Sequence, residues 1–186
     1  MMEQVLAFDQ ALGTTGWFYY DGAEYYYGII SGLGKEYALD ERVAYMVRAM
    51  QHLVDRLEPD TILLESVQLQ SNVMSHKQLS CLLGGAMYMS HQNYIRPFIF
   101  APSEWRKVIR TYARVKGIEI SKSCKRQEWK ELALALANDT LPDGLVIDDA
   151  RGITRKSQLY DVADAHGILA YYLSCKEELI SAIDED

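Results

Sequence analysis

The sequence predicts an α/β fold: a five-stranded mixed sheet, three antiparallel strands and then two parallel ones, flanked by helices. Short apolar runs of strand length alternate with longer segments whose apolar residues recur every three or four positions. Two of the short runs end in a carboxylate, as strands often do at the carboxyl edge of an α/β sheet. With 186 residues, about half of them apolar, the chain can form a full core, and we expect one domain over residues 1–186.

The first strand is predicted at the apolar run from Val5 to Phe8, which Asp9 ends. A turn of small residues follows as far as Gly16. A charged residue at the end of a buried strand is a candidate for chemistry. The alternative is that Asp9 only caps the turn, because Asp, Gly and Thr all favour turns.

A hairpin comes next, because two aromatic runs at 17–20 and 25–30 are joined by the Gly-containing segment 21–24. Its tyrosines are typical of packing in a sheet, although exposed aromatic rings can also stack on nucleic-acid bases. The chain therefore begins with three antiparallel strands.

A helix from about Tyr37 to Leu57 leads to a second apolar run that ends in a carboxylate, Thr61 to Ser66 with Glu65 near its end. A strand–helix–strand connection favours parallel pairing with the first strand, which would make Asp9 and Glu65 neighbours. Two close carboxylates repel unless a cation or a proton lies between them. Either this register is wrong, or the two carboxylates form a metal site.

The middle of the chain predicts further helices and one short strand. Gly84-Gly85-Ala86 offers a flat face for close helix packing, and Ser103 is the expected N-cap of the helix with Trp105 and Ile109 on its apolar side. The predicted elements are a helix over 76–92, a strand over 97–101, a helix from Pro102, a loop over 112–120, and a helix from near Ser123 to Ala137.

The last helix opens at Asp161-Val162-Ala163-Asp164-Ala165, after an irregular stretch. Carboxylates three residues apart lie on one helix face, and we expect both in the first turn. Such a pair can hold a cation. It can equally well only complement the helix dipole, which is a common use of aspartate in a first turn.

The formal net charge of −7 argues against a nucleic-acid partner, but its distribution does not. Between Glu104 and Lys130 nine basic residues face three acidic ones. Such a tract can bind phosphates or can simply be a solvated helix face. The three cysteines suggest no disulfide framework, and the expected absence of a signal peptide and of a membrane span indicates a cytoplasmic protein.

Taken in order, four motifs resemble the ribonuclease H-like fold, and in detail the RuvC-type Holliday junction resolvases, in particular their phage-borne branch. They are Phe8-Asp9-Gln10-Ala11-Leu12-Gly13-Thr14-Thr15-Gly16-Trp17, Leu63-Leu64-Glu65-Ser66-Val67, Pro102-Ser103-Glu104-Trp105-Arg106-Lys107 and Asp161-Val162-Ala163-Asp164-Ala165. The resemblance covers nearly the whole chain. One departure is Gln10-Ala11, where the cellular resolvases are expected to have Pro-Gly.

The resemblance implies an endodeoxyribonuclease that nicks Holliday junctions and related branched DNA in recombination, repair or phage DNA processing, and it leaves open whether forks and flaps are cut as well. Asp9, Glu65, Asp161 and Asp164 would be the catalytic carboxylates, binding two Mg²⁺ ions for which Mn²⁺ can substitute. The expected DNA contacts are Lys107, Arg110, Arg114, Lys116, Arg155 and Lys156.

The resemblance also implies a homodimer, because two strands of a four-way junction must be cut by paired sites. The candidate interface is the helix over 76–92 and the residues just before it, with Met74, Leu79, Leu82, Leu83 and Met87. A role in the core explains the same residues equally well.

Two other functions fit parts of the sequence. A binding protein for branched DNA on the same fold would need no catalysis, although four acids near phosphates would hinder it. Asp9-Gln10 followed by Gly13-Thr14-Thr15 also resembles the phosphate-binding turn of sugar kinases and actin-like ATPases, which need a second domain. An unrelated α/β domain with coincidental acids is a third alternative. Metal-dependent nicking of branched DNA discriminates among them.

Overall fold

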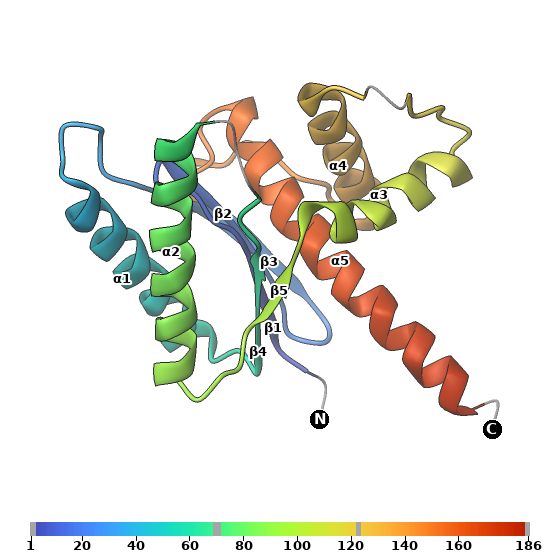
Figure 1. The fold of residues 1–186 in the computed structure, drawn as a ribbon. Coiled ribbons are helices and arrows are strands. Elements are labelled where there is room, and N and C mark those ends of the chain that lie inside the picture. The colour runs from blue at the N-terminus through green and yellow to red at the C-terminus, as the bar shows by residue number, and fades with distance from the viewer. Residues whose placement is uncertain (1–2, 69–71, 122–123, 185–186) are drawn as a thin grey trace.

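A five-stranded mixed sheet forms the centre of the molecule in the computed structural model, which describes residues 3–68, 72–121 and 124–184 (Figure 1). The strands lie in the order β3-β2-β1-β4-β5. Their bounds are β1 Val5–Asp9, β2 Thr14–Tyr20, β3 Tyr25–Ser31, β4 Thr61–Glu65 and β5 Phe98–Phe100. The first three pair antiparallel, whereas β1–β4 and β4–β5 are parallel. The predicted fold class is therefore confirmed.

Alternation along β1 divides the core between the two faces of the sheet. Leu6 and Phe8 join the cluster on the side of α1 and α2, whereas Val5 and Ala7 join the cluster on the side of α5. All four side chains are fully buried. A strand covered on both faces has to be apolar at every position, which explains the continuous run in the sequence.

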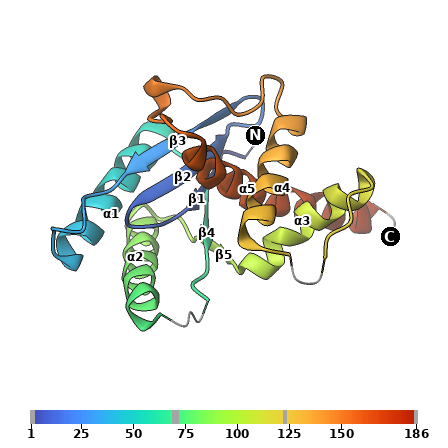
Figure 2. The ribbon, with the colours of Figure 1, turned by 90° about the horizontal axis from the view of Figure 1, so that it is seen from above.

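Two helices cover one face of the sheet, α1 Leu39–Leu57 and α2 Val73–Gln92 (Figure 2). They pack closely because Gly85 lies against Val47, where an added Cβ would come within 2.7 Å of Val47 Cγ2. The predicted flat face is thus used at Gly85, while Gly84 has open space around it. The Asn72 side chain caps α2 by accepting hydrogen bonds from Met74 N and Ser75 N.

The other face is crossed by the long helix α5 Lys156–Asp184, and α3 Pro102–Val115 and α4 Arg126–Thr140 pack against α5 (Figures 1 and 2). Tyr112 Oη donates a 3.0 Å hydrogen bond to Asp139 Oδ2, and Lys116 Nζ lies 2.7 Å from the same oxygen. These contacts tie the end of α3 to α4. In the part of the chain that the structure describes, no helix is both long enough and apolar enough to cross a bilayer.

Two predicted boundaries around α3 are wrong. Its N-cap is Ala101 rather than Ser103; Pro102 is the first helical residue, and Glu104 Oε2 accepts a 2.7 Å hydrogen bond from Ala101 N. The helix also continues to Val115, so Arg114 lies in its last turn and not in a loop. The predicted start of α4 near Ser123 lies outside the described residues; α4 begins at Arg126.

The prediction for the last helix is wrong at its start. It begins at Lys156, so Asp161 and Asp164 lie beyond its first turn. The buried Gln158 explains the earlier start, because its Oε1 accepts hydrogen bonds from Thr154 N and Arg155 N, just ahead of the helix. Complementing the helix dipole, an effect that fades within one turn, therefore does not account for the two aspartates.

Candidate functional site

Two of the predicted site carboxylates lie at the same edge of the sheet. Asp9 ends β1 and Glu65 ends β4, and these parallel strands pair from Val5 and Thr61 up to Phe8 and Leu64. Gln10 extends the pairing by one residue with its side chain: the amide nitrogen donates to Glu65 O, and the amide oxygen accepts from Glu65 N at 3.1 Å. Gln10 is buried and acts as a clamp that holds the two strand ends together.

The other two carboxylates arrive on α5, which crosses the sheet in direct contact with β2. Gly16 lies opposite Asp9 in the β1–β2 register. A Cβ at Gly16 would lie 2.1 Å from Asp161 O, so only glycine allows the helix backbone to come this close. This contact brings Asp161 and Asp164 to the edge where Asp9 and Glu65 lie. The turn after Asp9, predicted to run as far as Gly16, is shorter in the structure, because β2 already begins at Thr14.

The pKa values of three of these carboxyls show how strongly they interact. Burial, then Asp164 and Asp161, raise the pKa of Asp9 well above its ordinary range. Burial and the nearby Asp9 raise the pKa of Glu65 to about 7, although a hydrogen bond from Trp105 opposes the rise. Burial also raises the pKa of Asp164 to about 7, with Glu65 and Asp161 adding to the effect. The cluster carries more negative charge than its surroundings neutralise.

Lys130 of α4 lies between the two aspartates of α5. Its Nζ is 3.0 Å from Asp161 Oδ1 and 3.7 Å from Asp164 Oδ2. Burial alone would lower the pKa of Lys130, but Asp164 and Asp161 outweigh it and the pKa is raised. The side chain of Lys130 is only 17% exposed, so this ion pair belongs to the site and not to the solvated surface.

A groove of about 420 Å³ opens beside Glu65 and is lined by cationic, amide and aromatic side chains. Its lining includes Gln10, Glu65, Gln68, Arg106, Arg126 and Trp129. Arg106 and Arg126 lower the pKa of Glu65, which places their positive charge near the carboxylates. Arg106 Nε is buried and has no hydrogen-bond partner among the described residues.

Trp105 connects this groove to the core. The indole is buried, and its Nε1 donates a 2.9 Å hydrogen bond to Glu65 Oε1, which fixes the orientation of that carboxylate. Behind the ring lies Gly167 of α5, where an added Cβ would come within 3.0 Å of the indole. The sequence analysis named Trp105 on an apolar helix face and within a motif but gave it no role at the carboxylates, so its hydrogen bond to Glu65 was missed.

The carboxylates fit a hard divalent cation by their chemistry. Mg²⁺ prefers carboxylate oxygens, and a bound cation would offset both the burial and the mutual repulsion that raise the three pKa values. Within the described residues, however, no three acidic, histidine or cysteine side chains are close enough to enclose a metal ion. The ammonium of Lys130 is the cation that contacts Asp161 and Asp164 in this structure.

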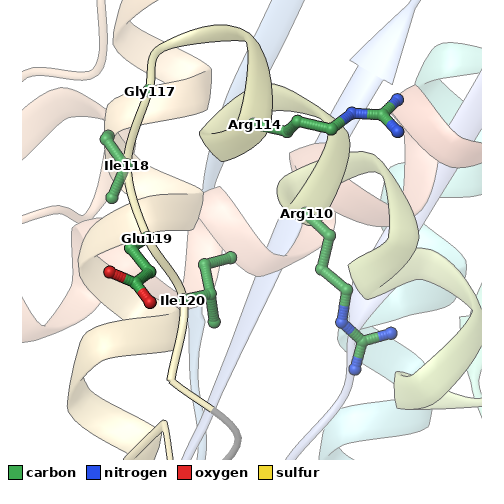
Figure 3. A pocket seen from close by; sticks show the side chains of 6 residues that line it. All are labelled: Arg110, Arg114, Gly117, Ile118, Glu119 and Ile120. Carbon is green, nitrogen blue, oxygen red and sulfur yellow. The ribbon is translucent and has the colours of Figure 1, made fainter.

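The six predicted DNA-contact residues lie on exposed parts of α3 and around the start of α5. Arg110 and Arg114 border a surface cavity of about 480 Å³, and Figure 3 shows their side chains extending from α3 with Ile118 on the far side. Arg110 also lies over the Trp129 ring, 5.3 Å from its centroid. Lys107 lies 6.0 Å from the centroid of the Tyr171 ring, and Lys116 pairs with Asp139. Arg155 and Lys156 are exposed.

The sequence reading missed four polar residues that the structure brings to the carboxylates: Gln10, Arg106, Arg126 and Lys130. Gln10 and Arg106 entered the sequence analysis only as members of motifs, and Arg106, Arg126 and Lys130 were counted within the basic tract, so none of the four was predicted at the site. No local signal distinguishes Arg106, Arg126 and Lys130 from the remaining basic residues, because their distance from the carboxylates depends on how α3 and α4 pack against α5.

Comparison with solved structures agrees with this architecture. Thermus thermophilus RuvC in complex with Holliday junction substrate superposes with a TM-score of 0.63 at 11% identity, over 94% of this chain and 96% of that one. A second Thermus thermophilus RuvC structure gives a TM-score of 0.61 at 12% identity, over 93% and 96%. The yeast mitochondrial Holliday junction resolvase gives 0.53 at 12% identity, over 92% and 78%.

The chain thus has the ribonuclease H-like fold of the RuvC resolvases. No protein-family model matches the sequence, and no curated protein matches it either. At 11–12% identity the likeness establishes the fold and leaves the activity to be argued from the site.

Proposed function

We propose that this chain is a structure-selective endodeoxyribonuclease that nicks Holliday junctions and related branched DNA by metal-dependent phosphodiester hydrolysis. The observation that carries the proposal is the meeting of four carboxylates from β1, β4 and α5 at one edge of the sheet, where burial and mutual repulsion raise three of their pKa values. Such a cluster costs stability and is typical of a site that binds a cation.

Asp9, Glu65, Asp161 and Asp164 would hold Mg²⁺, with Mn²⁺ as a substitute. When bound, divalent metal lowers the pKa of an attacking water and stabilises the negative charge that develops on the leaving 3′-oxygen. The surrounding residues position these ligands. Trp105 orients Glu65 by its hydrogen bond, and Gln10 holds the ends of β1 and β4 at a fixed spacing.

The groove beside Glu65 is the proposed path of the cleaved strand. Arg106 and Arg126 line it and would bind phosphate oxygens next to the carboxylates, where the buried Arg106 Nε has a hydrogen bond to offer. Arg110 and Arg114 continue the positive surface along α3 towards its C-terminal end. Contacts to phosphates position the duplex arms without reading their sequence.

Symmetric nicking needs two copies, and we propose that the exposed face of α2 forms the homodimer interface. Of the five residues predicted for it, Leu82 is fully buried against α1 and the sheet, and Leu79, Leu83 and Met87 are half-buried, whereas Met74 is exposed. Val73 and Tyr88 are exposed as well, at 75% and 66%. Exposed apolar groups on one helix face suit a twofold contact between copies.

The first experiment compares cleavage of a labelled four-way junction with cleavage of a linear duplex of the same sequence, in Mg²⁺ and in Mn²⁺. Wild-type protein is expected to make paired nicks in the junction. Asp161→Asn should reduce the rate by at least roughly 100-fold, the cost of removing one preorganised charge at the reacting centre. Asp9→Asn should abolish cleavage while binding of the junction persists.

Asp143→Asn is the matched control, because this exposed aspartate of the loop after α4 lies outside the cluster. Full activity in Asp9→Asn or Asp161→Asn would remove the carboxylates from the mechanism. Junction binding without cleavage by the wild type in either metal would favour the non-catalytic DNA-binding function instead.

A further inference from the structure

The side chain of Lys130 occupies the position at which a cation is most needed. It reaches from α4 to α5 and places its ammonium 3.0 Å from Asp161 Oδ1 and 3.7 Å from Asp164 Oδ2. Its Nζ also lies 5.8 Å from the centroid of the Tyr160 ring. Lys130, Asp161 and Asp164 all have side chains less than a quarter exposed.

An ion pair this deep differs from the other lysine–aspartate contact between helices on this side of the molecule. Lys116 and Asp139 approach to 2.7 Å, but their side chains are 50% and 43% exposed. A solvated pair of that kind contributes little to stability, since water screens both charges. Removing one partner of a buried pair instead leaves an uncompensated charge, which is strongly destabilising.

The ammonium and a divalent ion need the same oxygens. Asp161 accepts the Lys130 hydrogen bond through Oδ1, and carboxylate oxygens of Asp161 and Asp164 are the proposed metal ligands. A metal ion bound to these oxygens would repel the Lys130 ammonium. The metal ion and the ammonium therefore compete even if each contacts a different carboxylate oxygen.

We propose that Lys130 is an internal counter-cation, a positioning residue that holds Asp161 and Asp164 together in the metal-free protein and competes with divalent metal for them. This inference rests on the metal site of the proposed function. The ion pair of Lys130 with Asp161 and Asp164 would stabilise the metal-free protein and, for the same reason, lower its affinity for metal. On metal binding the released ammonium would stand beside the site, ready to bind a phosphate oxygen of DNA.

The test uses calorimetric titration of the full chain with Mg²⁺, without DNA, together with thermal unfolding in EDTA and in Mg²⁺. Lys130→Gln removes the charge but keeps a hydrogen-bond donor, and Lys130→Met removes both. Both variants should unfold at a lower temperature than wild type in EDTA and bind Mg²⁺ at least about fivefold more tightly, the lower end of typical couplings between sites. The rise in melting temperature on adding Mg²⁺ should be larger for both variants than for wild type.

Two further variants serve as controls. Lys130→Arg keeps the positive charge and should leave Mg²⁺ affinity no tighter than in wild type. Lys116→Met removes the exposed pair with Asp139 and should leave Mg²⁺ affinity unchanged. The proposal would be overturned if Lys130→Gln and Lys130→Met both bind Mg²⁺ no more tightly than wild type and lose the same stability in EDTA and in Mg²⁺. Lys130 would then have only a structural role.

The outcomes separate this inference from the proposed function. If wild type binds Mg²⁺ but cuts no junction, the nuclease proposal fails and the affinities of the Lys130 variants still decide the role of Lys130. Binding by Lys130→Gln alone would support competition directly. An absence of Mg²⁺ binding in wild type and in both neutral variants would overturn the inference together with the metal site.

Discussion

At the scale of single residues, close backbone contacts restrict which side chains fit near the carboxylates, and Gly16 is the clearest example. It has no functional atom, yet the distance between β2 and α5 depends on it, because a Cβ there would overlap the carbonyl of Asp161. Gly13, the residue immediately before β2, lies in the same turn region, but nothing lies within 4 Å of the place where its Cβ would be.

We therefore expect Gly16→Ala to push α5 away from the sheet. The free energy of unfolding should fall by about 1–3 kcal/mol, the usual cost of overpacking a core. Mg²⁺ affinity should fall as well, because Asp161 and Asp164 move with the helix. Urea denaturation and calorimetric titration measure the two effects.

Gly13→Ala is the matched control for Gly16→Ala. It adds the same methyl group to the segment between β1 and β2, where there is space for it. Its unfolding free energy should stay within a few tenths of a kcal/mol of wild type. Equal behaviour of the two variants would show that the close approach of α5 to β2 does not limit the site.

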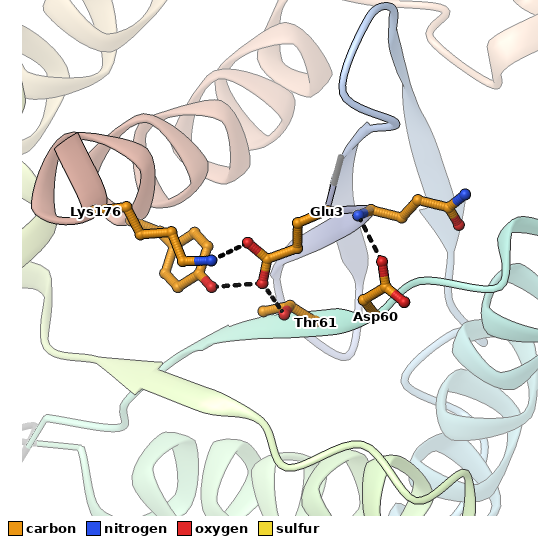
Figure 4. Close-up of polar contacts among 6 residues, drawn as sticks. Glu3, Asp60, Thr61 and Lys176 are labelled. Atoms are coloured by element: carbon orange, nitrogen blue, oxygen red, sulfur yellow. Dashed lines mark hydrogen bonds and ion pairs between the residues drawn. The ribbon is translucent and has the colours of Figure 1, made fainter. Parts of the chain in front are cut away.

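Among the elements, α5 has the greatest influence on the site, since it carries two of the carboxylates and crosses the sheet. Its far end is anchored by a polar cluster in which Glu3 is central (Figure 4). Glu3 accepts hydrogen bonds from Lys176 and Tyr172 of α5 and from Thr61 of β4. The cluster therefore ties the helix to the segment that leads into β1 and to the start of β4.

The stability that this anchor supplies should depend on pH in a defined direction. Burial alone would raise the pKa of Glu3, but hydrogen bonds from Lys176, Thr61 and Tyr172 outweigh it and lower the pKa. A carboxyl whose pKa is lower in the folded state stabilises the fold above its ordinary pKa, and this contribution is lost as the pH falls through the folded value.

Glu3→Gln is thus expected to lower the free energy of unfolding at pH 7 by less than about 1 kcal/mol, because the pair with Lys176 is partly exposed. The difference from wild type should shrink as the pH falls below the ordinary pKa of a glutamate and through the lower pKa of Glu3 in the folded protein. Urea denaturation at several pH values measures it. Glu177→Gln changes an exposed glutamate beside Lys176 and is the control. A difference that persists unchanged at low pH would show that the Glu3 charge is not responsible.

At the scale of the whole molecule, charge and exposed apolar groups place the proposed DNA-binding surface and the proposed dimer interface on opposite sides of the sheet. The basic segment lies on α3 and α4, on the side of α5, whereas the exposed apolar residues of α2 lie on the other side. The net charge of −7 therefore does not prevent DNA binding on the basic side. This arrangement leaves α2 available for a second copy.

The proposed dimer predicts that Tyr88→Glu yields a monomer, because a charge in an apolar twofold contact meets its own copy. Light scattering after gel filtration measures the mass. The monomer should still bind Mg²⁺, but it should lose the paired nicks in a four-way junction. Tyr94→Glu is the control, since Tyr94 is 99% exposed and lies beyond the end of α2. A dimer that survives Tyr88→Glu would place the interface elsewhere.

Sequence alone was enough to predict the sheet, because strand periodicity and turn chemistry are local. Asp9 and Glu65 stand out since each ends an apolar run, and parallel pairing of those runs follows from the helix between them. Asp161 and Asp164 share a helix face because of their spacing. These signals require no knowledge of distant contacts.

Tertiary structure decided which residues surround the four carboxylates. The end of α3 and the start of α5 were predicted wrongly. The buried Ala113 and the buried Gln158, whose side chain caps the segment ahead of α5, stabilise helix in segments that were predicted as loop or irregular structure. Lys130 looks like any other lysine of a basic tract until α4 packs on α5. The role of a charged side chain depends on the residues within a few ångströms of it. For Lys130 these residues come from segments far apart in the sequence.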